Sequence, residues 1–201
     1  MDSPIPESSQ NSLPSEMGNS TFSSKPNEAS SFFSYEEEDL SGQTLDVCFL
    51  EQKIGAGGMG SVYLAQHLTL SKKVAVKILP PQMARNQKLV ERFFREARSA
   101  AQLEHPNIVQ VYDVRTTKNA TYIVMQYIEG ITLRKKVTEE KLSLSEKLKI
   151  LYAVASGLAF AHQRNIIHRD IKADNVLISK FGEVKIADFG LAKVTDEYSS
   201  Q

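Results

Sequence analysis

At 201 residues, the chain is long enough for one large domain or two small lobes. Its 24 basic and 24 acidic side chains cancel, so no overall charge attracts it to nucleic acid or to an acidic membrane surface. The single cysteine, Cys48, cannot form a disulfide within the chain, which fits a reducing, cytoplasmic compartment and a buried, inert thiol rather than a reactive one.

The first 46 residues are rich in serine, asparagine, proline and glutamate and show little periodicity. Such a segment buries too little apolar surface to offset the entropy lost on ordering, so residues 1–46 are expected to be a disordered leader. They lack the basic and apolar regions of a secretory signal. The longest apolar run, residues 150–161, is shorter than the roughly 20 residues that cross a bilayer, so no membrane segment is expected in the visible chain.

Ordered structure is expected from Val47 onward. Apolar residues that recur every three or four positions between Leu89 and Leu103 predict a helix over residues 87–103. Pro80 and Pro81 end the strand before it, because proline cannot donate to a strand ladder. Five strands are predicted in this half of the chain, at residues 47–54, 61–65, 73–79, 108–114 and 121–126.

After Gly130 the pattern becomes mainly helical. Ser143 and Glu146 fit a capping box at the start of a helix over residues 144–162. Two short strands are expected after it, near residues 176–178 and 184–186, and no internal repeat is evident. The face of the helix that is predicted to carry its apolar stripe consists of Leu148, Leu151, Ala155, Leu158 and His162.

A glycine cluster separates the first two predicted strands. It has the pattern G-x-G-x-x-G-x-V from Gly55 to Val62, and glycines let a backbone approach a polyphosphate and present its amides to it. The signal alone is weak, since a plain glycine hairpin has the same appearance. A dinucleotide-binding fold needs a helix directly after the glycines, and the predicted strand at residues 61–65 argues against that fold.

Lys77 ends the third predicted strand, and Glu96 lies on or beside the apolar stripe of the helix that follows. A lone lysine at a strand end is normally a solvated charge, whereas an unpaired carboxylate on a buried face is costly. An ion pair between Lys77 and Glu96 would satisfy the carboxylate and aim the ammonium group at phosphate oxygens. The sequence therefore predicts this pair.

A second polar group follows the 144–162 helix, in the stretch from His168 to Asn175, and Asp188-Phe189-Gly190 comes soon after it. His168 is interpreted as a packed histidine beneath Phe189 rather than as a general base. Together with the glycines, Lys77 and Glu96, in this order, these residues resemble the motif set of the eukaryotic-type serine/threonine protein kinases. The resemblance covers residues 47 to about 193, and the glycine loop is most similar to that of bacterial members.

The resemblance implies roles for four residues of the phosphotransfer step. Asp170 is implied to accept the proton of the substrate hydroxyl. Lys172 is implied to contact the γ-phosphate, and its position two residues after Asp170 is typical of kinases that act on serine or threonine. Asn175 and Asp188 are implied to bind Mg²⁺, since both supply the hard oxygens that this ion prefers.

The resemblance also implies how ATP is bound. Lys77, held by Glu96, is implied to contact the α- and β-phosphates. Met125 resembles a gatekeeper, and residues 126–128 resemble a hinge whose backbone binds the adenine edge. The implied nucleotide-binding residues are Ile54, Gly55, Ala56, Gly57, Gly58, Met59, Gly60, Val62, Ala75, Lys77, Met125, Gln126, Ile128 and Leu177.

The fold implied by the resemblance is α+β and protein-kinase-like, with two lobes. A complete β-rich N-lobe and hinge are expected over residues 47–130, and a partial helical C-lobe over residues 131–201, ending in the activation segment. The expected partner is a protein with a serine or threonine hydroxyl, and no oligomeric state is predicted. A truncated, inactive ATP-binding pseudokinase or interaction module remains the alternative. In either case the 144–162 helix is expected to expose apolar surface.

Overall fold

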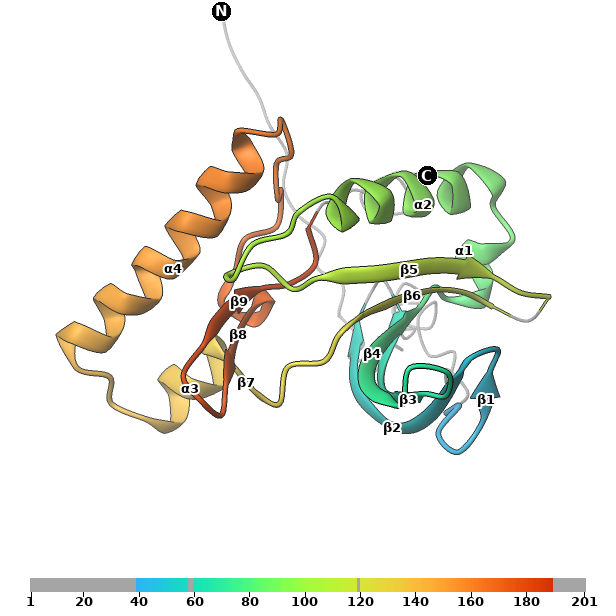
Figure 1. Ribbon diagram of the computed structural model, residues 1–201, viewed down its shortest axis with the longest axis horizontal. Helices are drawn as coiled ribbons and strands as arrows, with labels where there is room; N and C mark the ends of the chain where they lie inside the picture. Colours follow the sequence, from blue (N-terminus) through green and yellow to red (C-terminus); the bar gives the residue numbers. More distant parts are fainter. Residues whose placement is uncertain (1–38, 58–59, 119, 190–201) are drawn as a thin grey trace, which may run out of the picture. The chain divides into compact units, whose positions relative to one another are not determined.

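The computed structural model describes residues 39–57, 60–118 and 120–189 (Figure 1). The predicted leader up to residue 38, the loop residues Gly58 and Met59, and the predicted activation segment from Gly190 onward lie outside these residues. In the part described, no helix combines the length and the apolar character needed to cross a membrane.

A six-stranded antiparallel sheet forms the first part of the described chain (Figure 1). Its spatial order is β1-β2-β3-β4-β6-β5. The strands are β1 (Thr44–Leu45), β2 (Cys48–Gly57), β3 (Gly60–His67), β4 (Lys72–Ile78), β5 (Val111–Thr116) and β6 (Thr121–Gln126). All five predicted strands are therefore present, with shifts at their ends.

Alternation along β4 divides the sheet's apolar residues between two faces. Val74 and Val76 belong to a core with Cys48 and Tyr122, and burial raises the pKa of the Cys48 thiol, as expected of an inert one. Ala75 belongs to a second cluster on the other face, with apolar residues of β6 and α2. Because side chains alternate along a strand, Lys77 follows Ala75 onto that second face.

Helix α2 (Gln87–Ala101) covers the second face, and the short α1 (Pro81–Ala84) precedes it. The Asn86 side chain caps α2 by accepting hydrogen bonds from the N–H groups of Lys88 and Leu89. The buried residues of α2 recur at helical spacing: Leu89, Phe93, Glu96, Ala97 and Ala100. The predicted helix is confirmed and ends two residues before the predicted limit.

Two predicted boundaries were wrong. Order begins before Val47, because β1 pairs with β2 and the Leu40 N–H donates to the Tyr63 hydroxyl at 3.2 Å. The strand predicted from residue 108 begins at Val111, because the preceding segment bonds to β9 (Val184–Ile186) instead. The Ile186 N–H donates to the Asn107 carbonyl, and the Ile186 carbonyl accepts from the Val109 N–H. Long-range hydrogen bonds to β9 therefore keep Val109 out of β5, although the local sequence pattern favours a strand there.

A three-stranded sheet and two helices make up the second part of the described chain. The strands, in the order β7-β8-β9, are β7 (Gly130–Thr132), β8 (Val176–Ser179) and β9 (Val184–Ile186). The two helices are α3 (Leu133–Glu139) and α4 (Leu144–His162), and a short 3₁₀ turn, η2 (Ala173–Asn175), precedes β8. Gly130 lies where a Cβ atom would come within 2.0 Å of the Ile178 carbonyl oxygen. Strand β7, which was not predicted, therefore needs glycine at its first position.

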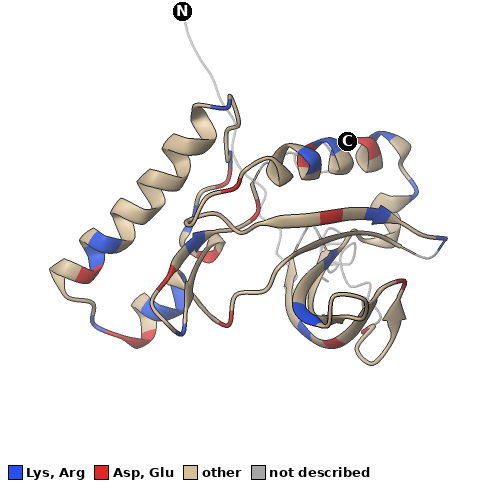
Figure 2. Cartoon of the chain, viewed as in Figure 1, with Lys and Arg blue, Asp and Glu red and all other residues tan. Residues whose placement is uncertain are grey.

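Helix α4 begins at the predicted capping box, in which Ser143 and Glu146 exchange hydrogen bonds. The expectation that this helix exposes apolar surface is confirmed. Ile150, Gly157 and Ala161 are buried, whereas Leu148 and Leu151, on the predicted face, are 56% and 63% exposed. Figure 2 shows few charges beyond the first turns of α4, and its large apolar residues include both the buried Ile150 and the exposed Leu151 and Tyr152. Periodicity alone therefore does not identify the packed side.

Candidate active site

His168 anchors the loop that carries the predicted catalytic residues. Its side chain is buried, its ring meets Phe189 edge-on with centroids 4.6 Å apart, and its Nε2 lies 2.8 Å from the Ala187 carbonyl oxygen. Burial lowers the pKa of His168, so the ring is neutral at neutral pH. Because Nδ1 accepts from the Asp170 N–H at 3.3 Å, Nε2 carries the proton and donates to Ala187. The predicted packing role of His168 is confirmed.

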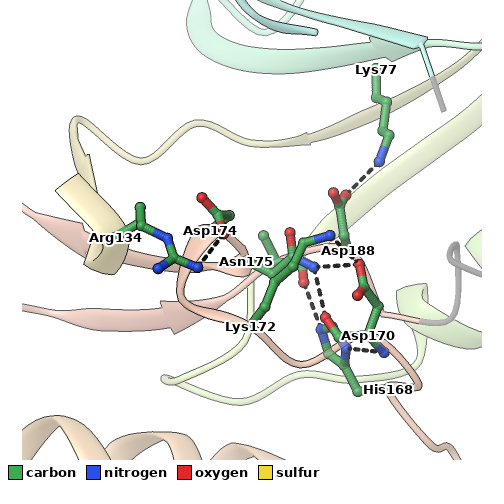
Figure 3. Close-up of polar contacts among 9 residues, drawn as sticks. Lys77, Arg134, His168, Asp170, Lys172, Asp174, Asn175 and Asp188 are labelled. Atoms are coloured by element: carbon green, nitrogen blue, oxygen red, sulfur yellow. Dashed lines mark hydrogen bonds and ion pairs between the residues drawn. The ribbon is translucent and has the colours of Figure 1, made fainter. Parts of the chain in front are cut away.

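Asp170 is held by two neighbours in the loop (Figure 3). The Lys172 Nζ lies 2.7 Å from Asp170 Oδ2, and the Asn175 amide donates to the same oxygen at 3.1 Å and to the Asp170 backbone carbonyl at 2.8 Å. The hydrogen bond from Lys172 is the main cause that lowers the pKa of Asp170. Asp170 is therefore an ionised acceptor at neutral pH, in a fixed position.

The backbone is strained at two points of this site. Arg169 and Asp188 have φ angles of 68° and 61°, in the left-handed region that residues other than glycine rarely adopt. Such strain costs on the order of 1–3 kcal/mol and persists where surrounding bonds impose it. One such bond is that from the Ala187 N–H to the Asn175 carbonyl, at 2.8 Å, which ties the two predicted metal-binding segments together.

Lys77 contacts Asp188 rather than Glu96. Its Nζ lies 2.8 Å from Asp188 Oδ1, and its side chain is only 4% exposed (Figure 3). Glu96 instead pairs with Arg92, one turn earlier on α2, with Arg92 Nε 3.2 Å from Glu96 Oε1. The predicted Lys77–Glu96 pair was therefore wrong for this structure, because each partner has a nearer opposite charge.

Glu96 is only partly satisfied by Arg92. Its Oε2 atom is buried and, among the residues described, has no hydrogen-bond partner. Burial raises the pKa of Glu96, against the lowering effect of Arg92. Leaving a buried polar atom unpaired costs about 1–3 kcal/mol.

The predicted adenine-facing residues come together in one apolar cluster. Ala75 and Met125 are buried partners across β4 and β6, and Val62, Ile128 and Leu177 pack against the same cluster. These residues come from both parts of the described chain, so their proximity in space could not be inferred from their separation in the sequence.

Two other predicted nucleotide contacts have different surroundings. Ile54 is 44% exposed and lies outside this cluster. The Gln126 N–H donates to the Gln110 carbonyl at 2.8 Å, so this hinge amide is already used within the chain.

The glycine cluster lies in the hairpin of β2 and β3, where Gly57 pairs with Gly60 and Gly55 with Val62. The predicted strand after the glycines is confirmed as β3, where a dinucleotide-binding fold would need a helix. Gly60 has φ = 102°, and a Cβ atom there would come within 1.9 Å of the Ile78 carbonyl oxygen. Gly57 faces open space, with nothing within 4 Å of its Cβ position, so of these two glycines packing requires Gly60 and not Gly57.

Asn175 and Asp188 have the oxygen atoms that Mg²⁺ needs. Both hydrogen bonds of the Asn175 side chain use its amide nitrogen, which leaves Oδ1 as its acceptor end. No group of three or more acidic, histidine or cysteine side chains that could hold a metal exists among the described residues. Mg²⁺ commonly uses one or two protein oxygens and completes its shell with phosphate and water, so the pair fits this ion together with a nucleotide.

Sequence reasoning missed Arg92, although a signal was present. Arg92 and Glu96 are four residues apart on a predicted helix, a spacing at which opposite charges meet. It also missed the ion pair between Arg134 and Asp174, at 3.3 Å, which joins α3 to the catalytic loop (Figure 3). No local pattern relates those two residues.

Comparison with known proteins gives concordant results. A family model described as "Protein kinase domain" matches residues 49–200. The serine/threonine-protein kinase PrkC of Bacillus subtilis is 46% identical over 140 residues, covering 69% of this chain and 22% of that protein. The serine/threonine-protein kinase PknB of Mycolicibacterium smegmatis is 43% identical over 149 residues, covering 72% of this chain and 24% of that protein. The chain thus spans about a quarter of the length of these relatives.

Solved structures give the same fold. A crystal structure of the Mycobacterium tuberculosis PknI kinase domain, carrying one cysteine-to-alanine substitution, matches with a TM-score of 0.68 and 35% identity, covering 77% of this chain and 64% of that one. A second PknI kinase domain structure matches with a TM-score of 0.66 and 36% identity, covering 75% of this chain and 61% of that one. The predicted α+β fold with a β-rich first lobe is confirmed.

Proposed function

Because the chain belongs to the protein kinase domain family, we propose that it supplies the nucleotide-binding part and the catalytic loop of a serine/threonine protein kinase. The reaction would transfer the γ-phosphoryl group of ATP to a serine or threonine hydroxyl of a protein substrate. The observation that carries the proposal is the ionised Asp170, held by Lys172 and Asn175. The predicted domain limits, with an N-lobe over 47–130 and a C-lobe from 131, are part of the proposal.

Asp170 would accept the proton of the attacking hydroxyl. Its lowered pKa keeps it ionised, and its bond to Asn175 orients the carboxylate. Lys172, which bonds Asp170 at 2.7 Å, would be shared with the γ-phosphate and reduce its negative charge. These two residues position the reacting oxygen, and phosphoryl transfer depends mainly on such positioning and charge stabilisation.

The other predicted site residues would bind the nucleotide. Val62, Ala75, Met125 and Leu177 would hold the adenine ring by apolar contact, in keeping with their shared cluster. The hairpin glycines would present backbone amides to the phosphates. Mg²⁺, held by Asn175 and Asp188, would neutralise phosphate charge when bound. Lys77 would move from Asp188 to the α- and β-phosphates.

The proposal is tested by an Asp170→Asn substitution. In the whole protein that carries this chain, the variant is expected to lose at least about 10²-fold in phosphate transfer to a serine/threonine substrate. It should still bind Mg·ATP, read as a rise in melting temperature. The matched control is Asp174→Asn, which changes an exposed carboxylate four positions away and should keep activity.

Two outcomes would count against the proposal. Full activity in Asp170→Asn would remove Asp170 from its role. Binding of Mg·ATP without transfer in the unsubstituted protein would favour the alternative, an inactive nucleotide-binding module. Its specific support is that Lys77 and Glu96 each pair elsewhere in this structure.

A further inference from the structure

The segment ahead of strand β1, residues 39–43, is tied to the first sheet. The Gly42 N–H donates to the carbonyl of Leu50, on β2, at 2.7 Å. The Leu40 N–H donates at 3.2 Å to the hydroxyl of Tyr63, an almost fully buried residue of β3. We call residues 39–43 the strap, because they fasten the chain before β1 to both of these strands.

Ser41 lies at the centre of the polar contacts of the strap. Its hydroxyl group donates to Asp39 Oδ1 at 2.7 Å and accepts from the Lys53 N–H at 3.2 Å. The Ser41 N–H donates to the same oxygen of Asp39 at 3.0 Å, and the hydrogen bonds from Ser41 are the main causes that lower the pKa of Asp39. Because the ionised carboxylate takes the hydroxyl proton, the hydroxyl oxygen is left as an acceptor for Lys53.

Lys53 lies beside an irregularity of strand β2. It pairs with Tyr63, whereas Gly55 pairs with the adjacent Val62, so Ile54 is the extra residue of a β-bulge. A bulge bends its strand and changes the direction of nearby side chains, and bulges are common next to active sites. Ile54 is a predicted nucleotide contact, and Gly55 is the first glycine of the hairpin. The conformation of β2 at this bulge therefore decides where both of them lie.

Strand β1 does not reach this part of β2. It pairs with β2 only at Cys48 and Phe49, so beyond Leu50 the strand is at the edge of its sheet in the part of the chain described. Such an edge presents backbone N–H groups without a ladder partner. At Lys53, the hydroxyl of Ser41 takes the place of that partner. A side chain twelve residues earlier in the chain thus holds β2 next to its bulge.

We propose that Ser41 is a positioning residue for nucleotide binding, because its hydroxyl group holds the β2 bulge and with it the glycine hairpin. The inference rests on the proposed function, in which the hairpin amides bind phosphate groups. A backbone that is already held in its binding conformation loses less conformational freedom when the ligand binds. Loss of the hydroxyl would release Lys53 and leave the hairpin to be ordered by the nucleotide itself.

The test compares Ser41→Ala with the unsubstituted whole protein that carries this chain. Calorimetric titration with Mg·ATP should show about three- to tenfold weaker binding in Ser41→Ala, the fold-change that corresponds to one net hydrogen bond. Ser41→Thr keeps the hydroxyl group and should restore the affinity. The matched control is Ser99→Ala, because the Ser99 hydroxyl donates within α2 to the Arg95 carbonyl, and its loss should leave the affinity unchanged.

A measurement without nucleotide separates this role from a general effect on folding. The Lys53 amide should exchange its hydrogen at least about tenfold faster in Ser41→Ala, while the amide of Val76, in the core of the same sheet, should be unaffected. A general loss of stability would accelerate both amides and would contradict the proposed role.

The two measurements distinguish failure of this inference from failure of the proposed function. Normal Mg·ATP binding by the unsubstituted protein with unchanged affinity in Ser41→Ala would overturn the inference and leave the proposed function standing. Absence of Mg·ATP binding by the unsubstituted protein would defeat the proposed function. In that case, faster exchange at Lys53 alone would still support the hold of Ser41 on β2, and unchanged exchange would refute it.

Discussion

The Lys77 ammonium group lies 2.8 Å from Asp188, and this ion pair connects strand β4 to the segment after β9. The Lys77 side chain is almost fully buried, whereas that of Asp188 is 32% exposed. The contact therefore joins a predicted phosphate-binding residue directly to a predicted metal-binding residue.

Replacing Asp188 by asparagine should destabilise the chain. The substitution preserves shape but leaves the buried Lys77 ammonium without its carboxylate, at a cost of about 2 kcal/mol, reduced from the value for a fully buried pair because Asp188 is partly exposed. Chemical unfolding measures the change. Asp174→Asn is the matched control, because its ion pair with Arg134 is 62% and 47% exposed and should contribute less than about 1 kcal/mol. Equal effects of the two substitutions would contradict this view.

Two glycines of the same hairpin should respond differently to alanine. Gly60→Ala should cost about 3 kcal/mol or more in unfolding free energy, because its Cβ would collide with the Ile78 carbonyl and its φ angle is positive. Gly57→Ala meets open space and should change stability by less than about 0.5 kcal/mol.

Gly57→Ala also tests the phosphate role of the loop separately from its folding. If the Gly57 backbone approaches a phosphate group, the added methyl group should weaken Mg·ATP binding while the melting temperature of the free protein is unchanged. Titration calorimetry and thermal unfolding provide the two measurements. Unaltered affinity would favour the plain glycine hairpin.

The exposed face of α4 should be open to polar substitution. Leu151→Lys is expected to change stability little, since Leu151 is 63% exposed, and to reduce self-association in light scattering. Ile150→Ala, on the adjacent position but the buried side, should cost about 3 kcal/mol. A larger loss for Leu151→Lys than for Ile150→Ala would show that the packed face had been misassigned.

Stability should fall in mild acid because of His168. Burial lowers the pKa of this histidine below its ordinary value of 6.5 in the folded chain. Between the two pKa values the unfolded chain binds the extra proton, so the contribution of His168 is fully present above about pH 6.5 and is lost as the pH falls toward the folded pKa. His168→Gln should reduce the pH slope of the unfolding free energy in this range. An unaltered slope from pH 8 to 5 would exclude His168 as its source.

Local chemistry alone was enough to predict much of this protein. The order of the motifs, the capping box of Ser143 and Glu146, and the strand that ends before Pro80 and Pro81 depend on residues close together in the chain, and the structure contains the expected elements. The clustering of Ala75, Met125 and Leu177 also followed from the family resemblance.

Tertiary structure decided the contacts for which the sequence offers several partners. The sequence predicted Glu96 as the partner of Lys77, but the fold brings Lys77 to Asp188, and the one-turn spacing on α2 pairs Glu96 with Arg92. Helix α4 is apolar on more than one side, so its packing against β9, with Gly157 against Ile186, determined which face is buried. Periodicity and composition describe one segment at a time, whereas ion pairs and buried faces depend on which segments meet in space.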